Sequence, residues 1–214
     1  MVVIDEFSGD AERIATLADA MGPLPETRSS YYPGGRRFIT EADVEAWDYV
    51  KVVCERASPF LGGGFDLADF YLLESSFSIV ATRTDELLPQ QRAPHFDSPN
   101  QKYLAVLHYL RVPEGTGTAF YRHRSTGIER VTEKNVDLFV RAAKADAAKL
   151  PADSGYIQGS DEFYEQTGTI EAVPDRLVIY QGSILHSGMI PPDMPLSTDP
   201  REGRLTANIF VQGR

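Results

Sequence analysis

The sequence predicts an α+β protein that is mainly β, a β-sandwich or barrel buttressed by helices. Helical patterns are grouped early in the chain, and many short β-rich runs separated by turn residues follow them. The sequence lacks the regular alternation of strand and helix that a parallel α/β sheet requires. The 214 residues, 42% of them hydrophobic and 24% charged, are enough for one domain with a sizeable core.

Two helical patterns come first. One follows a candidate cap at Ser8, places apolar residues at helical spacing between positions 14 and 21, and stops at a Gly-Pro pair. The other starts at Thr40, where Asp43 completes an imperfect capping box, and its apolar face continues to the glycines of residues 62–64. We expect both helices to cover the core.

We predict strands at residues 77–82, 103–112, 117–124, 176–180, 186–190 and 205–212. Turn sequences such as Ser98-Pro99-Asn100 separate these runs. A third helix with one apolar face is predicted from near Thr132 to the residue before Pro151. Residues 151–170 are predicted to form a long surface excursion, a type of segment that is more often functional than neutral.

The charge balance excludes some classes of partner. Lysine and arginine number 21 and aspartate and glutamate 31, a formal net charge of −10 that opposes binding to nucleic acid. No apolar run approaches the roughly 18 residues of a membrane span, and the acidic N-terminus does not resemble a signal peptide. We therefore expect a cytoplasmic protein with no membrane partner. The single cysteine, Cys54, excludes an internal disulfide and is interpreted as a small buried hydrophobe.

His95-Phe96-Asp97 is the candidate metal-binding motif. In an extended segment His95 and Asp97 project to one side and Phe96 to the other, so the imidazole and the carboxylate can take adjacent positions on one ion. A second histidine would complete a two-histidine, one-carboxylate triad, which leaves positions open and suits iron(II) in oxygen chemistry. Taken alone the spacing is a weak signal, because a surface histidine near a loop carboxylate has the same pattern.

His186 is the strongest candidate for the third ligand. It lies in the apolar run 183–190, where a histidine is costly unless it is hydrogen-bonded or bound to a metal. A core histidine bonded to a backbone carbonyl is the alternative. The other two histidines compete less well: His108 lies close to His95 inside a predicted strand, and His123 stands between two arginines that oppose a nearby divalent cation.

A polar strand face begins at Arg204. Alternation puts Arg204, Thr206 and Asn208 on one face of the predicted strand and aliphatic residues on the other. A guanidinium group fits the distal carboxylate of a keto-dicarboxylate, and the Thr206 hydroxyl can add a hydrogen bond. A solvent-exposed strand face is the alternative.

With these residues in this order, the chain resembles the iron(II)- and 2-oxoglutarate-dependent dioxygenase superfamily. The motif of that family is His-x-Asp/Glu, a distal histidine, and an arginine or lysine on the last core strand, matched here by His95, Asp97, His186 and Arg204. Residues 103–110, followed after a turn by residues 117–120, are similar to a strand-turn-strand of the prolyl-hydroxylase-like branch. By that register the resemblance implies that Tyr109 binds the cosubstrate carboxylate.

The resemblance implies a double-stranded β-helix, the jelly-roll or cupin-like core, over residues 71–212 of a single domain. Residues 1–70 would form a helical N-terminal buttress, and about residues 130–170 a helical insertion. It also implies Fe(II) as cofactor, 2-oxoglutarate and O2 as cosubstrates, and succinate as a product. Halogenases of the superfamily usually have a small residue in place of the motif carboxylate, so Asp97 favours a hydroxylase.

The expected substrate is a small molecule, an amino acid or a peptide. We assign its binding to a cationic cluster that could recognise an anionic group; surface arginines paired with acids are the alternative. The candidate residues are Arg92, Tyr121, Arg122, His123 and Arg124. Two other functions stay open: a cupin-like metalloenzyme that uses the same ligands without 2-oxoglutarate, and a non-catalytic β-helix binding module. The oligomeric state is not predicted.

Overall fold

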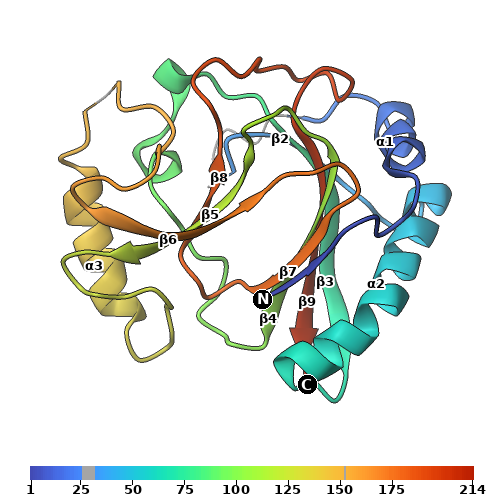
Figure 1. The fold of residues 1–214 in the computed structure, drawn as a ribbon, viewed down its shortest axis with the longest axis horizontal. Coiled ribbons are helices and arrows are strands. Elements are labelled where there is room, and N and C mark those ends of the chain that lie inside the picture. Colours follow the sequence, from blue (N-terminus) through green and yellow to red (C-terminus); the bar gives the residue numbers. More distant parts are fainter. Residues whose placement is uncertain (26–31, 152) are drawn as a thin grey trace.

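The computed structural model describes residues 1–25, 32–151 and 153–214. Its strands are β1 (Val2–Ile4), β2 (Gly34–Phe38), β3 (Phe70–Val80), β4 (Tyr103–Arg111), β5 (Gly117–His123), β6 (Tyr164–Glu171), β7 (Leu177–Gln181), β8 (His186–Met189) and β9 (Leu205–Gly213). Its helices are α1 (Ala11–Ala20), α2 (Val44–Phe65) and α3 (Val136–Ala147), with short 3-10 turns η1 (Thr84–Glu86) and η2 (Pro89–Gln91). The strands form two antiparallel sheets (Figure 1): a major sheet ordered β1-β7-β4-β9-β3-β2 and a minor sheet ordered β6-β5-β8.

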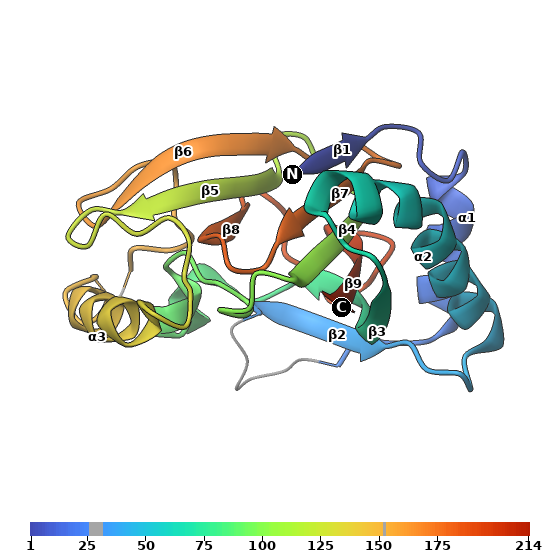
Figure 2. The ribbon, with the colours of Figure 1, turned by 90° about the horizontal axis from the view of Figure 1, so that it is seen from below.

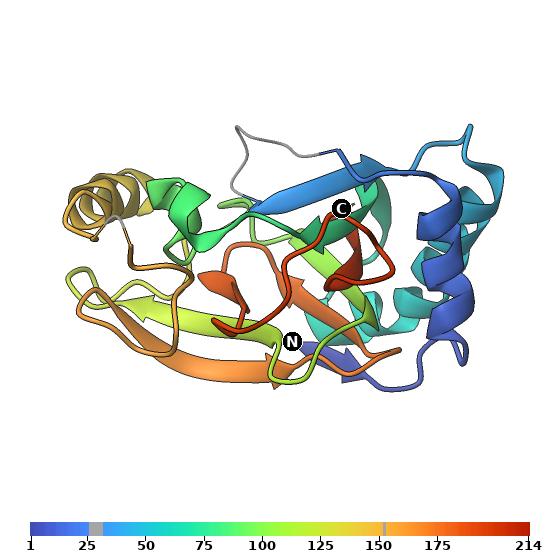
Figure 3. The same cartoon turned by 90° about the horizontal axis from the view of Figure 1, so that it is seen from above.

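The first two helices cover the outer face of the major sheet. Strand β9 shows why: Leu205, Ala207, Ile209 and Val211 are buried in one cluster with apolar residues of α1 and α2. The alternate residues of β9 face the other side of the sheet. Views from below and above place α1 and α2 at one end of the molecule and α3 at the other, with the strands between them (Figures 2 and 3). The inner face of the major sheet is therefore left free to form a site.

The minor sheet and α3 complete the interior. A second cluster, which includes Leu107, Phe120 and Val178, joins the inner faces of the two sheets. A third cluster packs α3 on the minor sheet. In it the Phe96 ring meets the Phe139 ring of α3 edge to face, with 5.8 Å between the centroids. Phe96 thus points toward α3, which leaves its neighbours on either side to point elsewhere.

Helix α1 begins later than predicted. It starts at Ala11, and the cap is Asp10, whose carboxylate accepts a hydrogen bond from the Arg13 amide at 3.0 Å. Ser8, the predicted cap, donates to Asp175 instead, at 2.5 Å. Asp10 lies nearer the helix and supplies the capping oxygen. The Ser8 hydroxyl is therefore free to bond Asp175, which is distant in sequence.

Helices α2 and α3 also differ from prediction at their ends. In α2, the Asp43 carboxylate accepts from the Thr40 amide at 2.9 Å, so the helix starts at Val44 rather than Thr40. It then continues through the predicted stop at residues 62–64 and ends at Phe65, where Asp66 takes a left-handed φ of 55°. In α3, a similar turn precedes Val136, so that helix starts after Thr132.

Three strands were not predicted: β1, β2 and β6. β1 and β2 form the two edges of the major sheet, so residues 1–70 contribute strands as well as helices. β6 occupies the last part of the expected excursion of residues 151–170, extends one residue beyond it and pairs with β5. The sequences of β2 and β6 are rich in glycine and polar residues, and their pairing with a neighbouring strand supplies the order that their side-chain pattern does not show. β3 is longer than predicted and starts at Phe70.

Cys54 lies on α2 and packs, partly buried, against the core cluster beneath the helices. Burial raises the pKa of its thiol to about 11, so the side chain is a neutral thiol at physiological pH. This agrees with its interpretation as a small hydrophobe. In the ranges that the structure describes, no helix has the length and apolarity needed to cross a membrane.

Candidate metal centre

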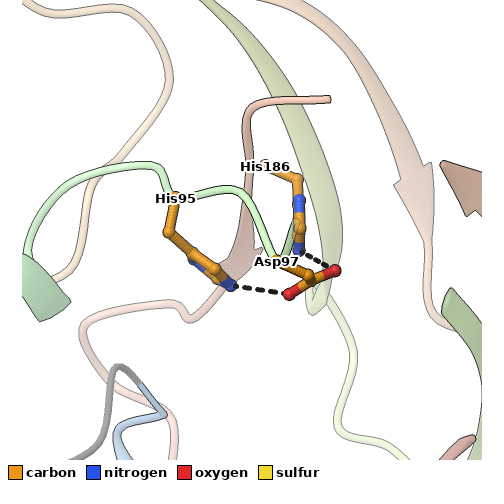
Figure 4. A group of neighbouring side chains, drawn as sticks. All are labelled: His95, Asp97 and His186. Carbon is orange, nitrogen blue, oxygen red and sulfur yellow. Dashed lines mark ion pairs between the residues drawn. The ribbon is translucent and has the colours of Figure 1, made fainter. Parts of the chain in front are cut away.

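Three predicted ligands, His95, Asp97 and His186, converge beside β8, an edge of the minor sheet (Figure 4). Their ligand atoms all lie within 4.8 Å of one another. Asp97 Oδ1 is 3.8 Å from His95 Nε2, and Asp97 Oδ2 is 3.7 Å from His186 Nε2. Metal–ligand bonds of about 2 Å bring adjacent ligand atoms to about 3 Å, so a small inward movement would close this set around one ion.

Backbone hydrogen bonds hold the motif in place. His95 and His186 form an isolated antiparallel bridge, exchanging backbone hydrogen bonds of 2.9 and 2.8 Å. The Asp97 amide donates to the Gly182 carbonyl at 2.7 Å. A side chain at Gly182 does not fit, because a Cβ there would lie 2.9 Å from Asp97 Oδ2 and 2.7 Å from Tyr103 Cδ1. Segments far apart in sequence therefore fix the spacing of the ligands.

The His186 ring is oriented by its own turn of chain. Its Nδ1 lies 2.8 Å from the carbonyl oxygen of Ile184. A carbonyl only accepts, so Nδ1 carries the proton and Nε2 presents its lone pair toward Asp97. Tyr180 packs against the ring edge to face at 4.9 Å between centroids. The backbone bond considered as an alternative thus occupies one nitrogen and leaves the other available, as in metal-binding histidines.

One oxygen of the Asp97 carboxylate has no hydrogen-bond donor among the described residues. This oxygen, Oδ2, is buried. Burial raises the pKa of Asp97, against the opposing influence of His186 and Arg36. Burial, reinforced by the neighbouring His186, lowers the pKa of His95 well below its usual value. A carboxylate oxygen without a donor beside two imidazoles fits a divalent cation, which would satisfy all three groups.

Arg204 immediately precedes β9 and faces the same space. It is 4% exposed, and its Nη2 donates to the Gly117 carbonyl at 3.1 Å. Its Nε is buried without a hydrogen-bond partner among the described residues. A buried cation with an unused donor is costly unless an anion pairs with it. Arg204 therefore fits an anionic ligand.

Tyr109 packs against this arginine, and Thr206 lines the same cavity. The Arg204 guanidinium lies over the Tyr109 ring, 5.4 Å from its centroid. The Tyr109 hydroxyl bonds the Thr118 hydroxyl at 2.7 Å, and burial raises the pKa of this tyrosine although Arg204 acts to lower it. Thr206 is buried, and its hydroxyl bonds Asn208 Oδ1 at 3.0 Å. The polar face predicted for β9 is thus an internal surface.

The three candidate ligands and Arg204 line one cavity of about 990 Å3. That volume is at the upper end of the range of about 300–1,000 Å3 typical of small-molecule sites. One part of the lining is polar and comes from β2, β3 and β9; it includes Arg36, Glu74, Thr206 and Asn208. Another part comes from α3 and is mostly apolar, with Phe139, Val140, Ala143 and Ala147 beside Lys144.

The structure does not bring the predicted substrate-binding cluster to this cavity. None of Arg92, Tyr121, Arg122, His123 and Arg124 is among the described residues that line it. Arg122 pairs with Glu129 and Glu165 at the surface, and Arg124 donates to the Asp161 carbonyl at 3.0 Å. Arg92 donates to the Pro151 and Leu87 carbonyls, at 3.0 and 2.7 Å. Tyr121 and His123 are buried, and Arg122 and Arg124 pair with other groups of the protein, so these residues form no cationic surface at the cavity.

The other two histidines hold the scaffold together. His108 is fully buried, with Nδ1 2.8 Å from the Tyr49 hydroxyl and Nε2 2.9 Å from Asp175. His123 is fully buried and lies 3.1 Å from Asp146 of α3. Neither lies in the group of potential metal ligands. Each is a core histidine satisfied by a carboxylate.

The sequence did not single out several residues of the site. Gly182, Tyr180 and Tyr103 surround the ligands, and Arg36 and Glu74 line the polar side of the cavity. Gly182 lies in a Gln-Gly-Ser run, whose composition is typical of a turn and carries no signal of a metal site. Arg36 lies in a glycine- and arginine-rich run with no apolar alternation, so its placement depends on β2 pairing with β3.

Comparison with solved structures identifies the fold. The viral collagen prolyl hydroxylase vCPH of Paramecium bursaria Chlorella virus-1, in complex with 2-oxoglutarate, is 12% identical, with a TM-score of 0.53 over 100% of this chain and 96% of its own. The α-ketoglutarate-dependent epimerase SnoN of nogalamycin biosynthesis is 10% identical, with a TM-score of 0.56 over 99% and 77%. HygX of Streptomyces hygroscopicus is 12% identical, with a TM-score of 0.55 over 99% and 82%. These likenesses confirm the double-stranded β-helix fold of the dioxygenases, prolyl hydroxylases among them.

Sequence comparison places the chain in a family. No curated protein sequence matches it. A family model described as "Family of unknown function (DUF6445)" matches residues 1–211, almost the whole chain. The protein therefore belongs to the DUF6445 family and has the fold of the iron(II)- and 2-oxoglutarate-dependent dioxygenases.

Proposed function

We propose that this protein is an iron(II)- and 2-oxoglutarate-dependent dioxygenase that hydroxylates a small molecule, an amino acid or a peptide. One observation carries the proposal: His95, Asp97, His186 and Arg204 line one cavity, in which Asp97 Oδ2 and Arg204 Nε have no hydrogen-bond partner among the described residues. Asp97 is an anion beside two imidazoles, and Arg204 is a cation. A divalent metal and a dicarboxylate are complementary to this pair.

Each residue has a separate task in this proposal. His95, Asp97 and His186 hold iron(II), and the Ile184 carbonyl keeps His186 Nε2 available. Arg204 binds the distal carboxylate of 2-oxoglutarate, Thr206 adds a hydrogen bond, and the Tyr109 ring supports the guanidinium. Bound iron supplies the oxidising power for a reaction that couples decarboxylation of 2-oxoglutarate to succinate with oxidation of the substrate. The chain contributes orientation and exclusion of water, for which the burial of Arg204 is suited.

The metal and cosubstrate are tested together by spectroscopy. Iron(II) and 2-oxoglutarate added without oxygen should give a weak visible charge-transfer band, and oxygen should then release succinate. His186→Ala should abolish both, because it removes a ligand. His108→Gln is the matched control, since His108 bonds Tyr49 and Asp175 away from the cavity. Stoichiometric iron without a band would contradict the proposal.

The cosubstrate assignment has its own test. Arg204→Ala should weaken 2-oxoglutarate binding by about 30-fold or more, because loss of one partner of a buried charge pair costs about 2 kcal/mol or more. Metal binding should be unchanged. Arg201→Ala is the control, since Arg201 is exposed and pairs with Asp199. Titration of 2-oxoglutarate by calorimetry measures the affinity of each variant. An unchanged affinity in Arg204→Ala would show that the anion binds elsewhere.

The same measurements separate the two alternative functions. A protein that binds metal stoichiometrically but releases no succinate would be a cupin-like metalloenzyme. A protein that binds no divalent metal under reducing conditions would be a binding module. The similar structures include a collagen prolyl hydroxylase and an epimerase of nogalamycin biosynthesis, so the fold alone does not select between peptide and small-molecule substrates.

A further inference from the structure

The cavity contains a second charged pair besides the candidate metal ligands. Arg36 of β2 and Glu74 of β3 both line it, and Arg36 Nη2 lies 2.5 Å from Glu74 Oε1. Arg36 Nη2 also donates to the Ser76 hydroxyl at 3.0 Å. Both charges act on Asp97: the pKa of that carboxyl is lowered by Arg36 and raised by Glu74, in addition to the main effect of burial. The pair therefore lies within electrostatic range of the metal ligands.

Arg36 lies close to two aromatic rings. Its guanidinium carbon lies 5.0 Å from the centroid of the Phe38 ring and 5.9 Å from that of the Tyr32 ring. The side chain is only 16% exposed, against 38% for Glu74, and Arg36 Nε is buried without a hydrogen-bond partner among the described residues. Exposed ion pairs contribute little to stability, and this arginine is instead largely buried, lies near two aromatic rings and has an unused donor. That is the state of a binding group.

The neighbouring residue provides a contrast on the same strand. Arg37 projects to the opposite face of β2, pairs with Asp43 at 3.0 Å, and does not line the cavity. The exposed fractions in this pair are reversed, with 35% for Arg37 and 15% for Asp43. The two arginines of β2 are thus chemically identical but face different environments, and only Arg36 is presented to the site.

A cation and an anion side by side are complementary to a zwitterion. In a free α-amino acid the ammonium and carboxylate groups share one carbon, so they reach two neighbouring groups of opposite charge at once. We propose that Arg36 binds the α-carboxylate and Glu74 the α-ammonium group of a free amino acid substrate. A peptide residue has neither charge on its backbone, so it would gain nothing from this pair, whereas a free amino acid would gain two charge-assisted contacts. The proposal rests on the dioxygenase function and names its substrate class.

The rest of the cavity indicates where the side chain of that amino acid lies. Helix α3 lines another part of the cavity with Phe139, Val140, Ala143 and Ala147, together with Lys144. An apolar side chain that extends toward α3 would bury against this wall, while its backbone charges remain at Arg36 and Glu74. The substrate class is therefore a free amino acid, and an apolar side chain would suit most of the α3 residues that line the cavity.

Binding is tested with the full-length protein and defined probes. The probes are the free apolar amino acids and, for each, the N-acetylated acid and the amide, which lack one charge. Ligand-observed NMR on the protein with iron(II) and 2-oxoglutarate, without oxygen, should show binding of at least one free amino acid, and at least about tenfold weaker binding of both its capped forms. The same free amino acid should stimulate succinate release. Binding of no free amino acid, or equal binding of the capped forms, would overturn the proposal.

Variants assign the two charges separately. Glu74→Gln should remove the preference for the free acid over the N-acetylated form, and Arg36→Gln the preference for the free acid over the amide. Arg37→Gln should retain both preferences. If Arg36→Gln fails to fold, Glu74→Gln and the capped ligands still decide. The charge-transfer band, recorded on the same samples, tests the dioxygenase function independently: a normal band without amino acid binding rejects only the substrate class, whereas loss of the band in the unaltered protein rejects the function itself.

Discussion

At the scale of single residues, the candidate metal centre depends on the absence of one side chain. The Gly182 carbonyl accepts a hydrogen bond from the Asp97 amide. Because Gly182 has no side chain, space remains for the Asp97 carboxylate and the Tyr103 ring. Its role is steric, since its backbone does not take a positive φ. Positioning groups of this kind tune a metal site even though they do not touch the metal.

Gly182→Ala should weaken metal binding without unfolding the protein. The added Cβ would lie 2.9 Å from Asp97 Oδ2 and so push the carboxylate out of line with the two histidines. We expect metal affinity to fall by about 10- to 100-fold, the range found when groups that orient ligands are altered. Cobalt(II) titration followed by absorption measures it. Gly168→Ala is the control, because nothing lies within 4 Å of its Cβ position; equal affinities in the two variants would contradict the steric argument.

At the residue scale, the sequence marked a candidate ligand where its side chain type was costly in its surroundings. His186 stood out because it interrupts an apolar run, and the structure places it beside His95 and Asp97. The arginines at positions 122 and 124 carried no such signal. Arg124 is exposed and Arg122 partly exposed in an acidic chain, and surface cations find partners in many arrangements that only the fold decides.

At the scale of elements, α3 forms one wall of the cavity and is attached by a buried polar contact. His123 Nε2 of β5 lies 3.1 Å from Asp146 of α3, and Lys149 donates to the same carboxylate at 2.7 Å. Lys149 and, less strongly, His123 lower the pKa of Asp146 against the opposing effect of burial. The contact couples the wall of the cavity to the minor sheet.

Asp146→Asn should loosen α3 while the major sheet stays protected. Its loss of charge weakens both hydrogen bonds, so amide hydrogen exchange across residues 136–147 should accelerate by about tenfold, equivalent to about 1.4 kcal/mol. Asp137→Asn, an exposed position on the same helix, should change exchange far less. Because the folded pKa of Asp146 is lowered, wild-type protection should be complete above the ordinary aspartate pKa of about 3.9 and be lost as the pH falls through the lower folded value. Equal exchange in both variants would show that apolar packing alone holds α3.

Element-scale prediction depended on side-chain period. The strands with alternating apolar residues, such as β9, were found with nearly correct bounds. β2 and β6 were missed because their order comes from hydrogen bonds to β3 and β5 rather than from an apolar face. Helix starts were displaced by a few residues, since several polar residues near each start compete for the capping position.

At the scale of the whole molecule, Asp175 joins the N-terminus to the sheet. Its carboxylate accepts from the amides of Ser8 and Gly9, at 2.9 and 2.7 Å, and from His108 at 2.9 Å. Its backbone has a positive φ of 66°, which aspartate and asparagine tolerate better than most residues. One residue thus anchors the segment before α1, the sheet interior and the turn before β7.

Asp175→Asn should destabilise the fold by about 2 kcal/mol, because it retains the backbone geometry but weakens several charge-assisted hydrogen bonds. Asp5→Asn is the matched control: Asp5 also joins the N-terminus to the start of β7 through Arg176, but its side chain is 59% exposed, and surface pairs contribute about 1 kcal/mol or less. Urea unfolding measures both free energies. A loss in Asp175→Asn no larger than in Asp5→Asn would contradict the anchoring role.

The sequence by itself determined most of the secondary structure and marked the candidate metal ligands and Arg204. Side-chain period marks a strand or helix wherever one face is buried, and a histidine in an apolar run, a His-x-Asp motif and a strand-leading arginine are local signals with chemical meaning. Only the tertiary structure decided which groups share the cavity. Arg36 reaches it because β2 pairs with β3, and Gly182 shapes it because the Asp97 amide bonds its carbonyl. These contacts join residues distant in sequence, and hydrogen bonds between backbones leave no pattern in the side chains.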